Sequence, residues 1–202
     1  MFSAARDDKP NDIQGVRARV LAAGRAEFAK HGLSAGSVRA IGERAGVTAA
    51  MINYYFGGKR ALYDAVVSEA QGRLAARIAA ALANGPGPGL AARLAGAYFD
   101  FLSEDQELQR LLMREVLDQG ESVRELAARY VAPLRALFAQ HFGEGDEAAH
   151  LAISLFGAVA GYFLYEPVLG AFLGADPHAP DTLARRRRHV LHLATLFEEM
   201  PR

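Results

Sequence analysis

Apolar residues recur along this chain with the period of an α-helix, almost from end to end. In the first segment Ile13, Val16, Val20, Ala23 and Phe28 follow one another at intervals of three to five residues, which places them on one helical face. No stretch combines apolar/polar alternation with the Val, Ile and Thr enrichment that is typical of strands. Ala, Leu, Arg and Glu, which favour helices, are abundant. The pattern therefore predicts an all-α protein.

Turn-forming residues divide this pattern into about nine helices. Residues 84–89 read Asn-Gly-Pro-Gly-Pro-Gly, a run that cannot stay helical. Pro133 is expected to kink the helix that contains it. We place a domain boundary after Gly58, which gives domains of residues 1–58 and 59–202. The expected helices are 12–30, 38–45, 49–56, 59–83, 90–103, 107–119, 122–141, 146–165 and 182–200, with turns at 143–145 and 176–180.

The segment from Ser37 to Phe56 has the spacing of a helix, a tight turn at Gly46 and a second helix. Small Ala45 and Gly46 are expected to let the two helices approach closely, with Val47 filling the turn. The apolar positions that pack these helices are Val38, Ile41 and Ala45 in the first and Ile52 and Phe56 in the second. This arrangement predicts a helix-turn-helix unit, whose second helix enters the major groove of DNA.

The residues left outside this apolar set have side chains that suit DNA. Alanines at the helix tip allow a close approach to bases, Asn53 can pair with an adenine edge, and tyrosine hydroxyls hold phosphates. Arg39 can reach a guanine edge, and Lys59 lies where free helix N–H groups also favour a phosphate. The candidate DNA contacts are Arg39, Thr48, Ala49, Ala50, Asn53, Tyr54, Tyr55 and Lys59. Spacing alone leaves open a unit that binds no DNA, with Tyr54 and Tyr55 as core aromatics.

A larger set of positions resembles the signature of TetR-family transcriptional regulators. These are Ala26-Glu-Phe28, Gly32, Ser37-Val38, Ile41, Ala45-Gly-Val-Thr48, Ile52-Asn-Tyr-Tyr-Phe56, Lys59 and Leu62, within about residues 13–66. Asn53 departs from the Tyr usual in the family and looks like a branch with Ala-Ala-x-Ile-Asn-Tyr-x-Phe-Gly-Gly-Lys. The resemblance implies an all-α homodimer with N-terminal DNA-binding heads and C-terminal helices that bind a small ligand. It also implies a palindromic operator, repression as the usual mode, and the eight DNA contacts named above.

The charge distribution fits a DNA-binding head. The chain has 202 residues with 23 basic and 23 acidic side chains, so its formal net charge is zero. Residues 1–60 nevertheless hold 10 Lys/Arg against 5 Asp/Glu, and the remainder holds 13 against 18. Such asymmetry indicates a nucleic-acid face on the basic part. The N-terminus has no apolar run of the kind that marks a signal peptide, and no segment reads as a membrane span. We therefore expect a cytoplasmic protein that uses no membrane.

The C-terminal part predicts a second interface and a ligand pocket. Helix 146–165 is apolar on all sides, which indicates that one side packs in its own domain and the other on a partner. We expect a homodimer through helices 146–165 and 182–200, with a buried core helix in a monomer as the alternative. An unidentified, largely apolar small molecule is expected between the middle helices. Its candidate contacts are Tyr98, Phe101, Leu102, Met113, Leu117, Phe138, Phe156 and Tyr162.

The sequence carries little that indicates catalysis. It has no Cys, which excludes thiol nucleophiles, thiol-based sensing and Cys-ligated zinc. No Ser/His/Asp arrangement, phosphate loop or metal-ligand cluster is recognisable, so we expect no catalytic residues, no metal and no cofactor. An enzyme or ligand carrier that uses the apolar helical pocket stays an alternative, as does a helical dimer that acts only through protein contacts. The run Arg185–Arg188 is expected to be a solvated helix face.

Overall fold

The computed structural model describes residues 10–85, 87–117 and 146–199, together with residues 124, 128, 135, 136, 139, 140 and 143. Within these residues the chain is helical and contains no strand. The expected helix 122–141 lies largely outside the described residues, as do Phe138 and Pro133. The nine helices of the described part are α1 (Pro10–Ala35), α2 (Val38–Ala45), α3 (Ala49–Phe56), α4 (Lys59–Leu82), α5 (Leu90–Glu104), α6 (Gln106–Leu117), α9 (Asp146–Leu164), α10 (Glu166–Leu173) and α11 (Pro180–Glu198).

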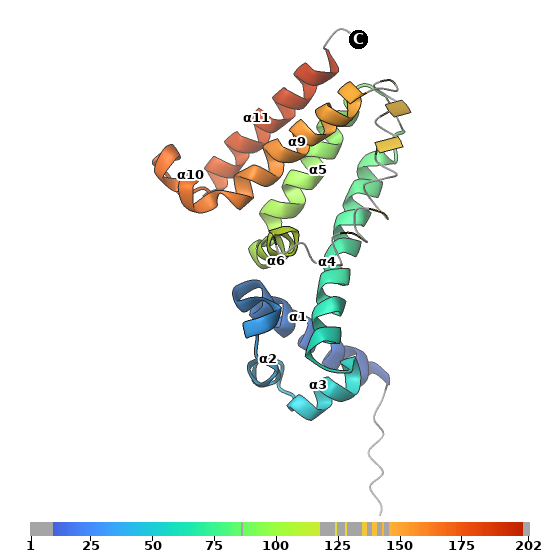
Figure 1. Ribbon diagram of the computed structural model, residues 1–202, viewed down its shortest axis with the longest axis vertical. Helices are drawn as coiled ribbons and strands as arrows, with labels where there is room; N and C mark the ends of the chain where they lie inside the picture. Colours follow the sequence, from blue (N-terminus) through green and yellow to red (C-terminus); the bar gives the residue numbers. More distant parts are fainter. Residues whose placement is uncertain are drawn as a thin grey trace, which may run out of the picture.

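The helices form a small head and a larger body, joined by α4 and α6 (Figure 1). In the head, α1 packs against α2 and α4, and α3 packs against α2 and α4. In the body, α5 lies between α4 and α11, and α9 packs on α5 and α11. Helix α6 lies against α1, so it connects the two parts. The all-α class and the head-and-body order agree with the sequence prediction.

One apolar core fills the head, and it draws on more than the predicted N-terminal domain. Phe28, Ile41 and Ile52 are completely buried, and the Phe28 ring meets Tyr63 of α4 edge to face with centroids 5.0 Å apart. Leu62 of α4 and Leu111 of α6 are also completely buried in this cluster. The division at Gly58 therefore stays a prediction, because the head's core includes side chains from both sides of it.

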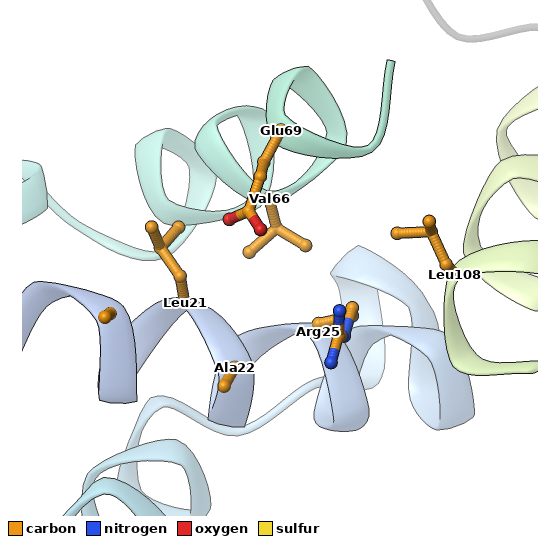
Figure 2. Close-up of a pocket in the computed structure, with 7 residues that line it drawn as sticks. Leu21, Ala22, Arg25, Val66, Glu69 and Leu108 are labelled. Carbon is orange, nitrogen blue, oxygen red and sulfur yellow. The ribbon is translucent and has the colours of Figure 1, made fainter. Parts of the chain in front are cut away.

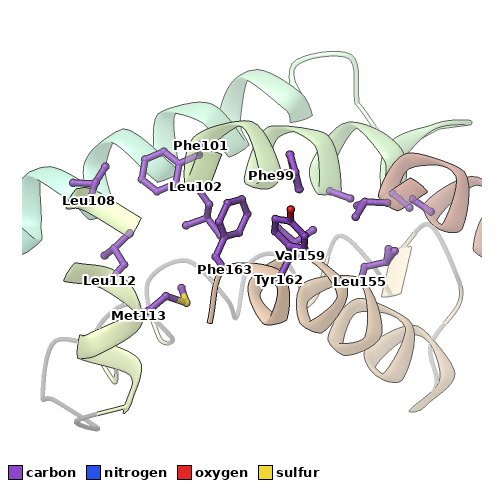
Figure 3. Packing of buried hydrophobic residues seen from close by; sticks show 14 of the residues in the cluster. Phe99, Phe101, Leu102, Leu108, Leu112, Met113, Leu155, Val159, Tyr162 and Phe163 are labelled. Atoms are coloured by element: carbon purple, nitrogen blue, oxygen red, sulfur yellow. The ribbon is translucent and has the colours of Figure 1, made fainter. Parts of the chain in front are cut away.

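A second core holds the body together (Figure 3). Phe99 at its centre has ring centroids 5.3 Å from Phe163 and 6.3 Å from Tyr162. Both aromatics come from α9, more than 60 positions along the chain from Phe99. The α11 side chains Val190 and Ala194 close this core and are completely buried. Aromatic groups at these separations attract one another beyond the area they bury.

Helix α10 was not expected from the sequence. The sequence analysis places one helix over residues 146–165, a turn at 176–180 and the next helix at 182–200, with no element between 165 and 176. The structure instead begins a new helix at Glu166, with Pro167 in its first turn. Proline is well tolerated there because the N–H groups of the first turn have no intrahelical partner. The proline thus begins a helix rather than interrupting one.

Three other local expectations changed. The helical run of α1 extends to Ala35, although Gly32 breaks it with φ 69°, near the predicted end. Ile13 is 44% exposed and does not belong to the buried face. Arg186 and Arg187 of the basic run are partly buried and have hydrogen-bond partners. Arg186 donates to the Ala158 carbonyl, and Arg187 donates two hydrogen bonds, of 2.7 and 2.8 Å, to the Asp100 carboxylate. Only Arg185 and Arg188 match the solvated face that was expected for this run.

Candidate nucleic-acid interface

The turn between α2 and α3 depends on two glycines with different roles. Gly46 ends α2 in the left-handed region, with φ 69° and ψ 35°, which strongly favours glycine. Gly42 is buried, and a Cβ at this position would lie 2.7 Å from the Val47 carbonyl oxygen. The backbone N–H of Val47 also donates to the Gly42 carbonyl at 2.9 Å. The close approach therefore needs Gly42, which sequence reasoning missed, while Gly46 supplies the turn conformation.

Each helix of this unit begins with a cap from its own sequence. The Ser37 hydroxyl accepts a hydrogen bond from the Ala40 N–H, and the Thr48 hydroxyl accepts one from the Met51 N–H, both at 3.2 Å. These bonds satisfy N–H groups that lack a partner within the helix. Thr48 thus positions the start of α3, in addition to any contact that its exposed side chain makes with DNA.

Helix α3 has one inward and one outward side. Ile52 is completely buried, whereas the Tyr54 side chain next along the outward side is 84% exposed. Thr48, Ala49, Ala50 and Asn53 are exposed as well. A large aromatic with so little burial adds nothing to the core, so its presence is better explained by a surface that binds something. Five of the eight predicted DNA contacts therefore share one free surface at the tip of the head.

Tyr55 differs from the other predicted contacts on α3. It is half-buried and packs against the core of the head, with its ring centroid 5.3 Å from that of Tyr54 in an edge-to-face arrangement. Its packing corresponds to the core-aromatic alternative, while Tyr54 lies in the open as a DNA contact should. The two neighbouring tyrosines therefore have different environments, which their adjacency in sequence does not distinguish.

The two predicted basic contacts have partners inside the protein. Arg39 is exposed and its Nε donates to the Glu43 carboxylate at 2.9 Å, one turn later on α2. Lys59 donates from Nζ to the Ser34 carbonyl oxygen at 2.8 Å, so it ties the start of α4 to the end of α1. The exposed ion pair between Arg39 and Glu43 is weak, so Arg39 can readily exchange Glu43 for a DNA phosphate. Lys59 keeps two further N–H donors, but it also has this structural role.

Two arginines of α1 were missed by the sequence analysis. The Arg17 guanidinium lies 4.6 Å from the centre of the Phe56 ring, a cation–π contact at the end of α3. Arg19 donates from Nε to the Ala45 carbonyl at the end of α2, at 3.2 Å. Both add positive charge beside the helix-turn-helix unit and hold it against α1. No local spacing rule reveals them, because each reaches 26 residues or more along the chain.

The predicted ligand contacts of the body fall into two groups. Phe101, Leu102, Met113 and Tyr162 converge from α5, α6 and α9 in the body core (Figure 3). Tyr98 is half-buried and stacks on Phe156 at 5.2 Å, and burial raises the pKa of its phenol well above the usual value. Phe156 is itself 53% exposed, Leu117 is 63% exposed, and Phe138 lies outside the described residues. The structure thus brings four of the eight side chains into one buried cluster, and Tyr98 packs against it.

Two hollows stand out in the described part of the chain, and neither is lined by these eight residues. One, of about 220 Å³, lies between α1, α4 and α6, and the other is a broader groove of about 530 Å³ between α4, α5 and α11. None of the described helices is both long enough and apolar enough to cross a bilayer. Among the described residues no group of three His, Asp or Glu side chains is arranged to hold a metal ion.

Residues 20–66 match the family described as bacterial regulatory proteins of the tetR family. This part of the chain is therefore similar to the N-terminal segment of tetR-family regulators. The chain is 27% identical over 164 residues to the "Probable HTH-type transcriptional regulator YttP" of Bacillus subtilis (strain 168), across 76% of this chain and 79% of that protein. The sequence match thus extends well beyond the head.

Solved structures support the fold of the whole chain. A TetR-like transcriptional regulator from Rhodococcus sp. RHA1 superposes with a TM-score of 0.69 at 20% identity, covering 89% of this chain and 93% of that one. The regulator FadR from Bacillus subtilis, solved in complex with stearoyl-CoA, gives 0.64 at 17% identity, covering 88% and 97%. The fold is therefore that of TetR-type transcriptional regulators, with a helix-turn-helix head and a helical body.

Proposed function

We propose that this chain is a homodimeric transcriptional repressor whose head binds a palindromic operator and whose body binds a small, largely apolar ligand that releases the DNA. The observation that carries the proposal is the outward side of α3. It combines alanines, which permit close approach, with Asn53 and the 84% exposed Tyr54. Major-groove helices use such residues for base and phosphate contacts. The TetR-type match over residues 20–66 supports the same function.

We assign the DNA contacts to Arg39, Thr48, Ala49, Ala50, Asn53, Tyr54, Tyr55 and Lys59, with the recognition segment belonging to the branch that carries Asn at position 53. The exposed residues of α3 face bases, and Lys59 faces a phosphate beside the start of α4. The half-buried Tyr55 offers only its hydroxyl end. A regulator of this kind acts where the DNA lies, which is the cytoplasm in the bacteria of its relatives.

DNA binding is tested with fragments of the intergenic region beside the gene for this protein, by gel shift and fluorescence anisotropy at low salt. We expect specific binding that weakens steeply as salt rises, because phosphate contacts release counterions. Tyr54→Ala and Asn53→Ala should each weaken binding by about tenfold, the effect of losing roughly 1.4 kcal/mol. Their thermal stability should match the wild type, because both side chains are exposed.

Two basic residues make the test sharper. Arg39→Ala is expected to reduce the preference for the operator over unrelated DNA, whereas Lys59→Ala should weaken binding to all sequences alike. Because Lys59 also bonds the Ser34 carbonyl, the thermal unfolding of Lys59→Ala is measured alongside. A wild-type protein that binds no such fragment at low salt, or an unaltered affinity in Tyr54→Ala and Asn53→Ala, contradicts the proposed role of α3.

The homodimer is supported by apolar side chains that the body leaves exposed. On α9, Ile153 is 64% exposed, while Leu155 and Val159 on the other side of the helix are buried. Ser154 and Gly157 lie beside Ile153 on the exposed side, and small residues let two helices cross closely. On α11, Leu196 is exposed and can join the same interface, whereas Val190 and Ala194 are buried in the body core.

The dimer is tested by sedimentation equilibrium. Ile153→Asp places a charge in the proposed interface and is expected to give monomers, because burying an unpaired charge is costly. Leu117→Asp is the matched control: this leucine is equally exposed, at 63%, but lies on α6, which is not part of the proposed interface. A wild-type protein that is monomeric at micromolar concentration would overturn the dimer.

The ligand site is proposed where Phe101, Leu102, Met113 and Tyr162 converge. Aromatic and Met side chains suit an apolar ligand and repack around it. The FadR structure solved with stearoyl-CoA shows that one protein of this fold binds a ligand with a long apolar chain, attached to a polar, anionic coenzyme A group. We therefore test acyl-CoA thioesters of different lengths first, by their effect on operator binding. An enzyme that uses this pocket is the alternative, and it predicts chemical turnover of the bound molecule, which mass spectrometry of the incubated ligand detects.

A further inference from the structure

The hollow between α1, α4 and α6 is placed at the junction of head and body (Figure 2). Leu21 of α1, Val66 of α4 and Leu108 of α6 supply apolar walls, and the small side chains of Ala18 and Ala22 leave the space open. Its volume is about 220 Å³, whereas an apolar cavity of roughly 150 Å³ is enough to hold benzene. The hollow therefore accommodates a molecule built around one aromatic ring or a short branched alkyl group.

Two charged side chains border the hollow, and only one of them has a partner. Arg25 forms ion pairs with Asp105 at 3.0 Å and with Glu107 at 3.5 Å. Asp105 also lies 3.5 Å from Arg73. Glu69 extends from α4 toward α1, beside Val66 (Figure 2). Within the described part of the chain it takes part in no hydrogen bond or ion pair.

The local charge balance favours a cation. Arg25 and Arg73 face the three carboxylates of Asp105, Glu107 and Glu69, so the carboxylates outnumber the arginines. Arg25 makes the ion pairs described above, although its buried Nε has no hydrogen-bond partner in the described part of the chain. The Glu69 carboxylate is left to attract a positive group at the mouth of an apolar space. An anionic ligand would have to compete with Asp105 and Glu107 for Arg25. A cation gains attraction to Glu69 without breaking any contact.

We propose that this hollow is a binding site for a small organic cation, with an ammonium group at Glu69 and an apolar body against Leu21, Val66 and Leu108. The site is separate from the ligand pocket proposed for the body, since none of that pocket's residues lines it. A molecule bound here touches α1, α4 and α6 at once. Such a molecule therefore stabilises the present arrangement of head and body. Its binding does not depend on the proposed function; only its effect on operator binding rests on that function.

The binding claim is tested by isothermal titration calorimetry on the full chain at pH 7, without DNA. The probes are 2-phenylethylamine, phenylacetate and 2-phenylethanol, which share one ring and differ in charge. We expect the amine to bind with 1:1 stoichiometry and at least tenfold more tightly than phenylacetate, with the alcohol between them. No measurable binding of the amine, or equal affinity for amine and acid, would overturn the proposal. Because no DNA is present, either result leaves the repressor proposal standing.

Variants locate the site. Glu69→Gln keeps the shape of an exposed side chain but removes its charge, so the preference for the amine over the alcohol should disappear. Ala22→Met extends a side chain into the hollow and should abolish binding of all three probes. Ala80→Met is the matched control: Ala80 is also an exposed alanine, on α4, but lines the other groove. Unaltered amine binding in Ala22→Met, with circular dichroism showing the native fold, would contradict this location.

Discussion

The head and the body differ in how the first backbone N–H groups of a helix find hydrogen-bond acceptors, as α3 and α5 show. Helix α3 of the head is capped by Thr48, which bonds an N–H only three residues further on. Helix α5 of the body has no cap from its own N-cap residue, Gly89. Its first N–H groups donate instead to the carboxylate of Glu198, which accepts from Gly89 at 2.6 Å and from Ala91 at 2.7 Å, more than 100 residues away.

The same difference appears in the surfaces that each part offers. The head presents its candidate site outward, on one face of an eight-residue helix. The body assembles its candidate pocket inward, from side chains of α5, α6 and α9. Local contacts suffice for an outward surface, because the residues that bind need only face away from a small core. An inward pocket depends on how distant helices pack, and each helix contributes only a few side chains.

The largest effect is expected in the two cores, and it tests whether head and body are separate at all. Phe99→Ala in the body and Phe28→Ala in the head each remove an almost completely buried ring and should cost about 3–5 kcal/mol of the free energy of unfolding. Because Leu111 of α6 packs in the head while Leu112 packs in the body, we expect one cooperative transition. Urea titrations followed by circular dichroism measure it. Two resolved transitions would instead establish two independent folding units.

A smaller loss is expected at the turn of the head. Gly42→Ala places a Cβ 2.7 Å from the Val47 carbonyl oxygen. The backbone must shift to make room for it, which should lower the free energy of unfolding by about 1–3 kcal/mol. Operator affinity should fall as well, because the angle between α2 and α3 changes. Gly72→Ala is the control, since a Cβ there meets nothing within 4 Å on α4 and should stabilise by about 0.5–1 kcal/mol. The prediction fails if the two variants have the same thermal midpoint.

The two kinds of cap can be compared directly by alanine substitution. Glu198→Ala should destabilise by about 2 kcal/mol, because a hydrogen bond to a charged group contributes roughly 1.5–3 kcal/mol. Thr48→Ala should cost about 1 kcal/mol, as neutral N-caps do. Glu198→Gln keeps an acceptor without the charge and should fall between wild type and Glu198→Ala. Differential scanning calorimetry ranks the variants, and a Thr48→Ala loss larger than that of Glu198→Ala would reverse the expected order.

The smallest effect concerns the exposed pair on α2. Glu43→Gln frees Arg39 and removes a negative charge near the proposed DNA surface. Stability should change by less than about 0.5 kcal/mol, and operator affinity should rise about two- to fivefold, the range that one exposed charge pair supports. Glu104→Gln breaks an ion pair with Arg77 in the body and should leave operator affinity unchanged. Anisotropy titrations at low salt measure both, and equal changes in the two variants would contradict a specific role for Arg39.

The sequence predicted those features that depend on contacts between residues close together in the chain, and it missed those that depend on contacts between distant residues. The helix-turn-helix unit, its caps and the outward position of five predicted DNA contacts were readable, because the deciding interactions lie within a few residues. Tyr55 and Tyr54 could not be separated, since only the packing of α3 on the head core buries one of them. In the body, α9 was correctly expected to have a buried and an exposed side. Which side of α11 faces the core, and that Arg187 grips Asp100, depended on packing between helices 87 residues apart.

The sequence by itself determined the all-α class, most helix boundaries and a basic head with a helix-turn-helix unit. Helix propensity, capping and apolar periodicity act over a few residues, so short stretches of sequence are enough to predict them. The tertiary structure decided the cap that Glu198 provides for α5, the joint cores at α4 and α6, and the hollow that brings Arg25, Glu69 and Leu108 together. These features arise where distant helices meet, and the angle and register of that meeting are set by the packing of whole side chains rather than by local spacing.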